Sequence, residues 1–210
     1  MEELNLLKKS WNKDNQKFEQ VSESQIYKMI HKISSSNVKW ILIISVLEFL
    51  AWTSISLCFN TDDYFKKLHA ESFIPFFKIL NAINYAVIFW FIYKFYKSYI
   101  KISTTTSTKQ LMKDILSTRK TVQNYVAYNL SMIAISMVLG FVLAYLYNPK
   151  FDAIKFQIAH DNYTMLFKMI GIFGGFLFVF VFGFWLLYKL LYGILLRKLR
   201  GNYNELKKIE

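Results

Sequence analysis

The chain has few of the residues that cross-link small folds or interrupt helices. Its 210 residues include one cysteine, Cys58, with two prolines and seven glycines. A single cysteine excludes a disulfide framework and any zinc site built on two or more thiolates. Disorder is excluded as well, because disordered chains are poor in aromatic residues, and this chain has 20 Phe, 14 Tyr and 5 Trp.

Long apolar runs are what the chain has instead, and apolar residues make up 54% of it. A helix needs about 20 mostly apolar residues to cross ~30 Å of hydrocarbon. Four stretches qualify, at about 38–59, 73–93, 122–147 and 165–196. Each has aromatic residues near an end, where amphipathic rings prefer to lie. The sequence therefore predicts an all-α integral membrane protein, a four-transmembrane-helix bundle with short cytoplasmic amphipathic helices.

Basic residues alternate between the predicted loops. Residues 1–39 hold seven Lys, residues 94–121 hold seven Lys and Arg, and the tail from Lys189 holds six, whereas the other two loops hold four between them. Positive residues stay on the cytoplasmic side, so both termini are predicted to be cytoplasmic. The net charge of +12 then faces anionic inner-leaflet lipid, and no nucleic-acid partner is expected.

Three parts follow from this division: a cytoplasmic N-terminal helical region at 1–37, a membrane domain at 38–196 that includes the cytoplasmic segment 94–121, and a cytoplasmic tail at 197–210. One helical face of the first part predicts contact with the membrane interface or a partner, with a solvated tail as the alternative. That face consists of Leu4, Leu7, Trp11 and Phe18.

Local signals mark several helix boundaries. Ser22 and Gln25 form a potential capping box, which predicts a helix that leads into the first span. The run 34–37, with three serines and an asparagine, predicts a kink. The Ser/Thr-rich stretch 103–108 predicts an interruption, and Asn148-Pro149 predicts the end of the third span.

Glu48 is the sharpest candidate for chemistry. It lies about ten residues into the first span, near the bilayer centre, where a carboxylate costs roughly 3 kcal/mol unless it is paired or protonated. We expect it to face the bundle interior, to be largely protonated, and to reach Asn81 or Asn84. Asn129 joins this predicted intramembrane polar cluster from the third span. The cluster is interpreted either as a structural hydrogen-bond site or as a proton- or ion-handling site.

Glycines are concentrated in the fourth span. Small residues let helix backbones approach closely, which predicts packing inside the bundle or, alternatively, formation of a homo-oligomer. The candidate packing residues are Gly171, Gly174, Gly175 and Gly183.

The sequence contains no recognised catalytic constellation. The three histidines lie on opposite sides of the predicted membrane and cannot form one metal site. There is no phosphate-binding loop, HExxH or G-x-S-x-G motif. Neither a metal nor a cofactor is therefore expected.

The stretches LLKKSWNKDNQ, SESQIYKMIHKISSSNVKW and TRKTVQNYVAYNL resemble uncharacterised four-span inner-membrane proteins of flavobacteria and related Bacteroidetes. The resemblance implies the bacterial inner membrane. It also implies a regulatory role, since some members lie beside sigma factors. Such proteins are sometimes labelled carotene monooxygenases, but that class binds iron through four histidines and this chain has three.

Two functions remain open at this point, and an integral-membrane enzyme ranks behind both. The first is a non-enzymatic membrane protein that presents cytoplasmic helices to a protein partner, with a regulatory role. The second is a small transporter or channel subunit that uses Glu48.

The predicted topology is testable by cysteine accessibility. With Cys58 replaced by serine, a cysteine at residue 155 is expected to react with a membrane-impermeant reagent outside intact cells. A cysteine at residue 110 is expected to stay protected, because it lies on the basic, cytoplasmic side. Labelling of residue 110, or none at residue 155, contradicts the assignment.

Overall fold

A computed structural model describes residues 22–59, 61–159 and 163–209. This part of the chain contains no strand, which agrees with the all-α prediction. The apolar face predicted in the first 18 residues lies outside it. The elements are α2 (Glu23–Cys58), α3 (Thr61–Lys67), the 3-10 turn η1 (Glu71–Phe73), α4 (Ile74–Thr104), α5 (Thr108–Tyr147), the 3-10 turn η2 (Pro149–Phe151), α6 (Asp152–Ala159) and α7 (Tyr163–Ile209).

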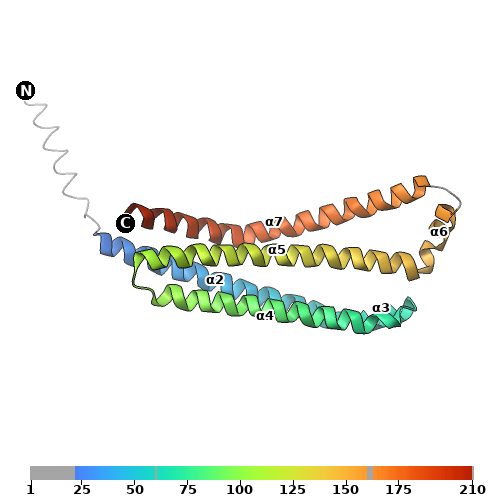
Figure 1. The fold of residues 1–210 in the computed structure, drawn as a ribbon, viewed down its shortest axis with the longest axis horizontal. Coiled ribbons are helices and arrows are strands. Elements are labelled where there is room, and N and C mark those ends of the chain that lie inside the picture. Colours follow the sequence, from blue (N-terminus) through green and yellow to red (C-terminus); the bar gives the residue numbers. More distant parts are fainter. Residues whose placement is uncertain (1–21, 60, 160–162, 210) are drawn as a thin grey trace, which may run out of the picture.

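Four of these helices are long and apolar enough to cross a membrane: α2, α4, α5 and α7. The chain is therefore a multi-pass membrane protein, and the predicted bundle is confirmed. The helices run side by side, and each packs against two neighbours in the cyclic order α2, α4, α5, α7. The short helices α3 and α6 lie at one end, here called the hairpin end (Figure 1). The start of α2 and the C-terminus lie at the other, the tail end.

Local chemistry sets the helix boundaries. The Ser22 hydroxyl accepts a hydrogen bond from the backbone N–H of Gln25, and the Gln25 side chain accepts one from the Ser22 N–H, which completes the predicted capping box. The α4–α5 break at 105–107 falls within the predicted Ser/Thr-rich interruption. Helix α5 ends at Tyr147, directly before Asn148-Pro149. These three predictions are confirmed.

The four long helices extend beyond the predicted spans at the tail end. Helix α2 begins 15 residues before position 38, and α5 begins 14 residues before position 122. At 1.5 Å per residue, these extensions are about 20 Å long. We call this part, which lies beyond the predicted spans, the head and define it as residues 23–37, 94–104, 108–121 and 197–209. The predicted amphipathic segments in this part of the chain are continuous with the spans.

At the run 34–37, where the sequence predicts a kink, α2 continues without a break. Ser34 and Asn37 are buried against the other helices. The Ser34 hydroxyl accepts a hydrogen bond of 2.8 Å from the side-chain amide of Asn202 on α7. The polar run therefore joins two helices instead of breaking one, which local sequence patterns do not reveal.

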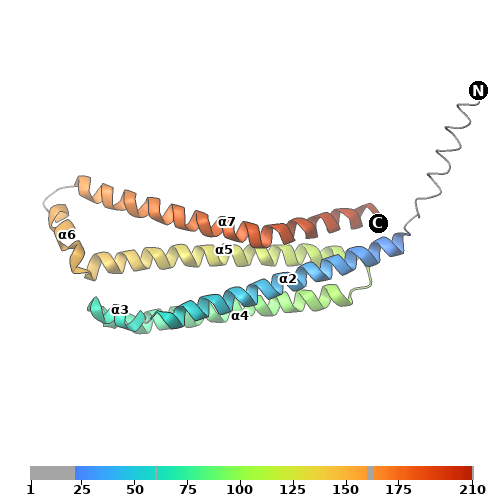
Figure 2. The ribbon, with the colours of Figure 1, turned by 180° about the vertical axis from the view of Figure 1, so that it is seen from behind.

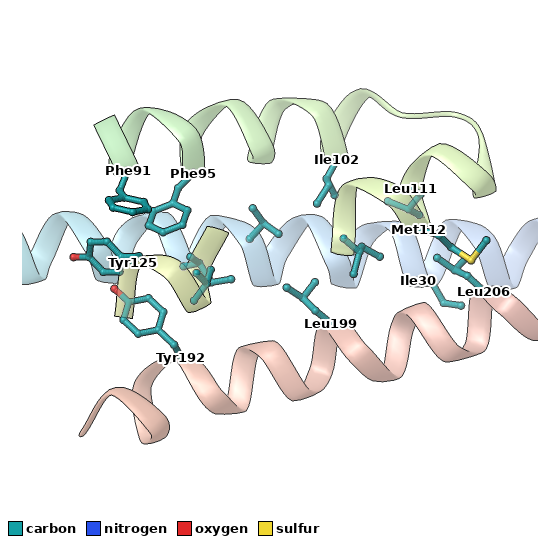
Figure 3. Packing of buried hydrophobic residues seen from close by; sticks show 14 of the residues in the cluster. Ile30, Phe91, Phe95, Ile102, Leu111, Met112, Tyr125, Tyr192, Leu199 and Leu206 are labelled. Carbon is teal, nitrogen blue, oxygen red and sulfur yellow. The ribbon is translucent and has the colours of Figure 1, made fainter. Parts of the chain in front are cut away.

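The larger buried cluster lies in the tail half of the bundle, and a smaller one, formed by Phe65, Leu68, Ala70 and Leu143, lies at the hairpin end. The apolar side chains of the larger cluster point inward from all four helices (Figure 3). In the hairpin half, α7 draws away from α5 (Figures 1 and 2). All four helices thus share one core at the tail end, whereas at the hairpin end α7 lies farther from α5 and contacts it through stacked rings such as those of Phe141 and Phe173, whose centroids are 3.8 Å apart. The core cluster comprises Ile30, Val38, Ile41, Phe91, Phe95, Ile102, Leu111, Met112, Ile115, Val122, Tyr125, Tyr188, Tyr192, Leu199 and Leu206.

The fourth-span glycines do not pack inside this bundle. A Cβ atom added at Gly171, Gly174, Gly175 or Gly183 meets no atom within 4 Å. The expectation of packing within the chain is therefore wrong for these four positions, because they lie on the part of α7 that splays outward. Their use against a second copy stays a prediction.

The location of the core generates a stability prediction. Ile115 is 0% exposed and Ile172 is 76% exposed, so Ile115→Ala and Ile172→Ala remove the same atoms from opposite environments. Truncating a buried isoleucine costs about 2–5 kcal/mol, whereas the exposed position loses no protein contacts of comparable extent. Thermal unfolding of the purified protein in detergent is expected to show a lower midpoint for Ile115→Ala alone. Equal midpoints for the two variants contradict this account of the core.

Candidate functional site

Glu48 on α2 is held by three tyrosine hydroxyls from two other helices. Its Oε2 accepts hydrogen bonds from Tyr125 of α5 at 3.0 Å and from Tyr192 of α7 at 3.1 Å. Its Oε1 accepts a bond from Tyr188 of α7. We call these four residues the tyrosine clasp. The carboxyl group therefore turns towards α5 and α7, and the partners expected from the sequence, Asn81 and Asn84, are replaced by tyrosines.

Aromatic packing fixes the three hydroxyls. Tyr188 and Tyr192 are one helical turn apart, and their rings stack at a centroid distance of 6.0 Å. The ring of Tyr125 meets Tyr192 edge-on at 5.9 Å. Phe91 and Phe95 of α4 each contact Tyr125 edge-on at 5.4 Å. Figure 3 shows Phe91, Phe95, Tyr125 and Tyr192 gathered at one level of the bundle. The clasp is thus bounded by apolar rings that limit access of water.

The clasp joins positions that the predicted spans put at different depths. Tyr125 lies three residues into the span predicted at 122–147, and Tyr192 lies four residues from the end of the span predicted at 165–196. Both positions are about 5–6 Å from the predicted tail-side boundary, whereas Glu48 lies ten residues into the span predicted at 38–59. The register between the helices therefore differs from the one that the four predicted spans imply.

The three asparagines of the predicted polar cluster have other partners or surroundings. Asn84 accepts a hydrogen bond of 3.0 Å from the Tyr128 hydroxyl. The side-chain amide of Asn129 donates to the backbone carbonyl of Tyr125 at 3.0 Å. Asn81 is exposed to a cavity. The predicted cluster therefore separates into the clasp, which contains Glu48, and a group of amides on its hairpin side.

A cavity of about 360 Å³ lies between the four long helices on the hairpin side of the clasp. Tyr188 lines it and also bonds Glu48, so this hydroxyl connects the cavity to the carboxyl group. A second hollow of about 310 Å³ shares Asn81 and Asn84 with it and continues towards α3. Polar side chains in the first cavity are Ser56, Asn81, Asn84, Tyr85, Asn129, Ser136 and Tyr188.

An ion pair lies at the second hollow. The Lys78 ammonium group lies 2.7 Å from the Asp62 carboxylate of α3. Lys78 therefore pairs with Asp62 at the hairpin end, and the partners of Glu48 are the clasp tyrosines. On the tail side of the clasp, the fully buried side chains of Ile41 and Phe95 fill the bundle. Within the described helices, the two hollows thus extend from the hairpin end to the clasp, and the packed core begins there.

The arrangement offers hydrogen bonding and proton exchange. A carboxylate has about four acceptor positions, so it can accept all three hydroxyl protons. A protonated Glu48 has one fewer acceptor position and one donor, and one tyrosine oxygen must then accept. Within the described residues, no group of three His, Cys, Asp or Glu side chains is placed to hold a metal ion.

Tyr188 and Tyr192 are functional candidates that the sequence analysis missed as partners. Aromatic residues near span ends are typical of the membrane interface, and that pattern hides a buried role. The available signal was their spacing of four residues, which puts both hydroxyls on one helical face.

Residues 24–210 match a family model described as a domain of unknown function, DUF8845. Comparison with curated proteins gives no match, and comparison with solved structures gives none either.

The clasp generates a prediction about Glu48. Glu48→Gln keeps the shape and an acceptor oxygen, and we expect it to preserve folding. Glu48→Leu leaves three buried hydroxyls without their acceptor and is expected to loosen the bundle by roughly 1 kcal/mol, the scale of interhelical hydrogen bonds in membranes. Thermal unfolding in detergent measures the difference.

A tyrosine pair supplies the matched control for this measurement. Tyr192→Phe removes a hydroxyl from Glu48, whereas Tyr128→Phe removes one from Asn84. In a Glu48→Leu background, Tyr192→Phe is expected to cost less than in the wild type, because its acceptor is already gone. Tyr128→Phe is expected to cost the same in both backgrounds. Additive costs for Tyr192→Phe refute the clasp.

Proposed function

We propose that this chain, which belongs to the DUF8845 family, is a non-enzymatic protein of the bacterial inner membrane that presents its helical head to a cytoplasmic protein partner in a regulatory role. The observation that carries this proposal is the location of the core. The tail half, including the head, has the larger buried cluster, whereas the hairpin half of α7 is exposed to its surroundings. A well-packed head outside the spans is suited to recognition.

Charge supports a cytoplasmic position for the head. The loops predicted on its side carry most of the lysines and arginines, and such residues are retained in the cytoplasm. The start of α2, the end of α7 and the α4–α5 connection lie at the same end of the bundle (Figure 1). One orientation therefore brings all three basic segments to one side of the membrane.

The outer face of α2 is the surface that suits a partner. Met29 is 59% exposed and Ile33 is 46% exposed, and the two lie one helical turn apart. Lys28 and Lys32 are exposed beside them. Methionine adapts to varied surfaces, so this face suits an amphipathic helix that combines apolar and acidic residues.

The tyrosine clasp has a structural role in this proposal. It joins α2, α5 and α7 where the head meets the membrane-spanning part. Because the hydrogen bonds fix the register of three helices, they also fix how the head presents α2. Glu48 then affects partner binding through the geometry of the bundle.

The second candidate is a small transporter or channel subunit that uses Glu48. The observation that favours it is the cavity that reaches Tyr188, whose hydroxyl bonds Glu48. The packed core on the tail side closes a path through the described part of one copy. This function therefore requires an opening movement, or a path formed with a further copy.

The test is photo-crosslinking of the full-length protein in membranes of its host. A photoreactive residue at position 29 or 33 is expected to give one discrete protein adduct, because both side chains project from the head. Positions 172 and 179, which are exposed on the apolar part of α7, serve as controls. Changing Lys28 and Lys32 to Glu is expected to remove the adduct by repelling an acidic partner.

Three outcomes contradict the proposal: no adduct from the head, equal adducts from the control positions, or an adduct that contains only a second copy. Proteoliposomes separate the second candidate. Proton flux that disappears in Glu48→Gln favours transport, whereas flux equal to that of empty vesicles favours the partner-binding role.

A further inference from the structure

We propose that a groove between α4 and α5, on the head side of the predicted spans, binds a phosphate group. The groove has a volume of about 230 Å³ and lies on the surface of the bundle, apart from the clasp and its cavity. Lysines and hydroxyl groups line it. The residues are Lys94, Lys97, Ser98 and Lys101 of α4, with Asp114, Ser117, Thr118 and Thr121 of α5.

The three lysines come from one helical face. Lys94, Lys97 and Lys101 are spaced by three and four residues, which places them one above another along α4 over about 10 Å. Among the ion pairs of the described residues, none involves these three side chains. Lys94 lies over the ring of Trp90 at 3.7 Å from its centroid, which holds it at the membrane-proximal end of the groove. Three lysine side chains thus line one small groove.

Hydroxyl groups complete the polar lining. Thr118 and Thr121 already donate to backbone carbonyls of α5, at 2.8 Å and 3.0 Å. Ser98 and Ser117 have no such bond among the described contacts, so their hydroxyls are available as donors. A phosphate group accepts hydrogen bonds and attracts ammonium groups. The groove offers both kinds of partner.

Asp114 is the one acidic residue of the lining, and its carboxylate has partners of its own. Its Oδ1 accepts from the Gln110 amide at 3.0 Å, and its Oδ2 accepts from the Thr105 hydroxyl at 3.4 Å. Asp114 lies about 10 Å along α5 from Thr121, towards the tail end. The membrane-proximal part of the groove, with Lys94 and Lys97, is therefore positive.

The level of the groove fits a lipid headgroup. Lys94 directly follows the span predicted at 73–93, and Thr121 directly precedes the span predicted at 122–147. Phosphates of membrane lipids lie at this boundary, and basic residues there attract anionic lipids. A free phosphate compound offers the same group, so the experiment must separate the two sources.

The experiment uses native mass spectrometry of the full-length protein in detergent. Phosphatidylglycerol is added as the probe, and diacylglycerol serves as the phosphate-free lipid. In the groove variant, Lys94, Lys97 and Lys101 are changed to Gln. In the control, Lys109, Lys113 and Lys120 are changed to Gln; these exposed lysines lie at the same end but outside the groove. Both variants lose three positive charges, and Gln is as good a helix former as Lys.

We expect the groove variant to bind phosphatidylglycerol roughly tenfold more weakly, because basic residues near the surface each add to lipid affinity. The control variant is expected to bind phosphatidylglycerol as tightly as the wild type does. Diacylglycerol is expected to bind to neither variant. Equal losses in both variants indicate diffuse attraction and overturn the proposal, as does undiminished binding by the groove variant. Unchanged circular dichroism and elution volume verify folding.

Inorganic phosphate separates the sources. If a lipid headgroup is the ligand, millimolar phosphate leaves phosphatidylglycerol bound. If phosphate displaces the lipid in the wild type and binds the control but not the groove variant, the site is a phosphate site filled from solution. Either result supports a phosphate-binding groove. The proposal is refuted if neither the binding of phosphatidylglycerol nor that of inorganic phosphate depends on the three groove lysines.

Discussion

The requirement that a half-buried carboxyl group keep hydrogen-bond partners sets the geometry of this bundle. Glu48 lies partly buried between the helices, and an unpaired charge there is costly. Three tyrosine hydroxyls meet the requirement, and they come from α5 and α7. Because tyrosine reaches far from its backbone, the helices stay separated by aromatic rings at this level. A slip of α2 by one residue turns the carboxylate away from all three donors, so the clasp fixes register as well as contact.

The two halves of the bundle on either side of the clasp are stabilised differently. On the tail side, side chains from all four helices fill the interior, and an Asn202–Ser34 hydrogen bond joins α2 and α7. On the hairpin side, the helices separate around amide-lined cavities, and exposed side chains on α7 are mostly apolar. Lipid removes the hydrophobic penalty for such exposure, so a membrane-spanning half needs less internal packing than an extramembrane head.

Much of the fold was predictable because long apolar runs report directly on a bilayer. Span number, helical class, the Ser22 cap and the Asn148-Pro149 stop depend on neighbours in sequence. The partners of Glu48 depend on register between helices, and counting along one span gives neither Tyr188 nor Tyr192. The packing predicted for the fourth-span glycines is absent for the same reason. A small residue permits close approach of another helix, but the path of α7 decides whether another helix is nearby. The uninterrupted run at 34–37 depends on α7 as well.

Helix α7 continues without a break from the hairpin end to the head. Its 47 residues form one helix, about 70 Å long. Tyr188 and Tyr192 fasten it near the middle, with about 25 residues on the splayed arm and about 17 on the head arm. The clasp therefore divides α7 into a longer arm on the hairpin side and a shorter arm in the head, where Leu199 and Leu206 are fully buried.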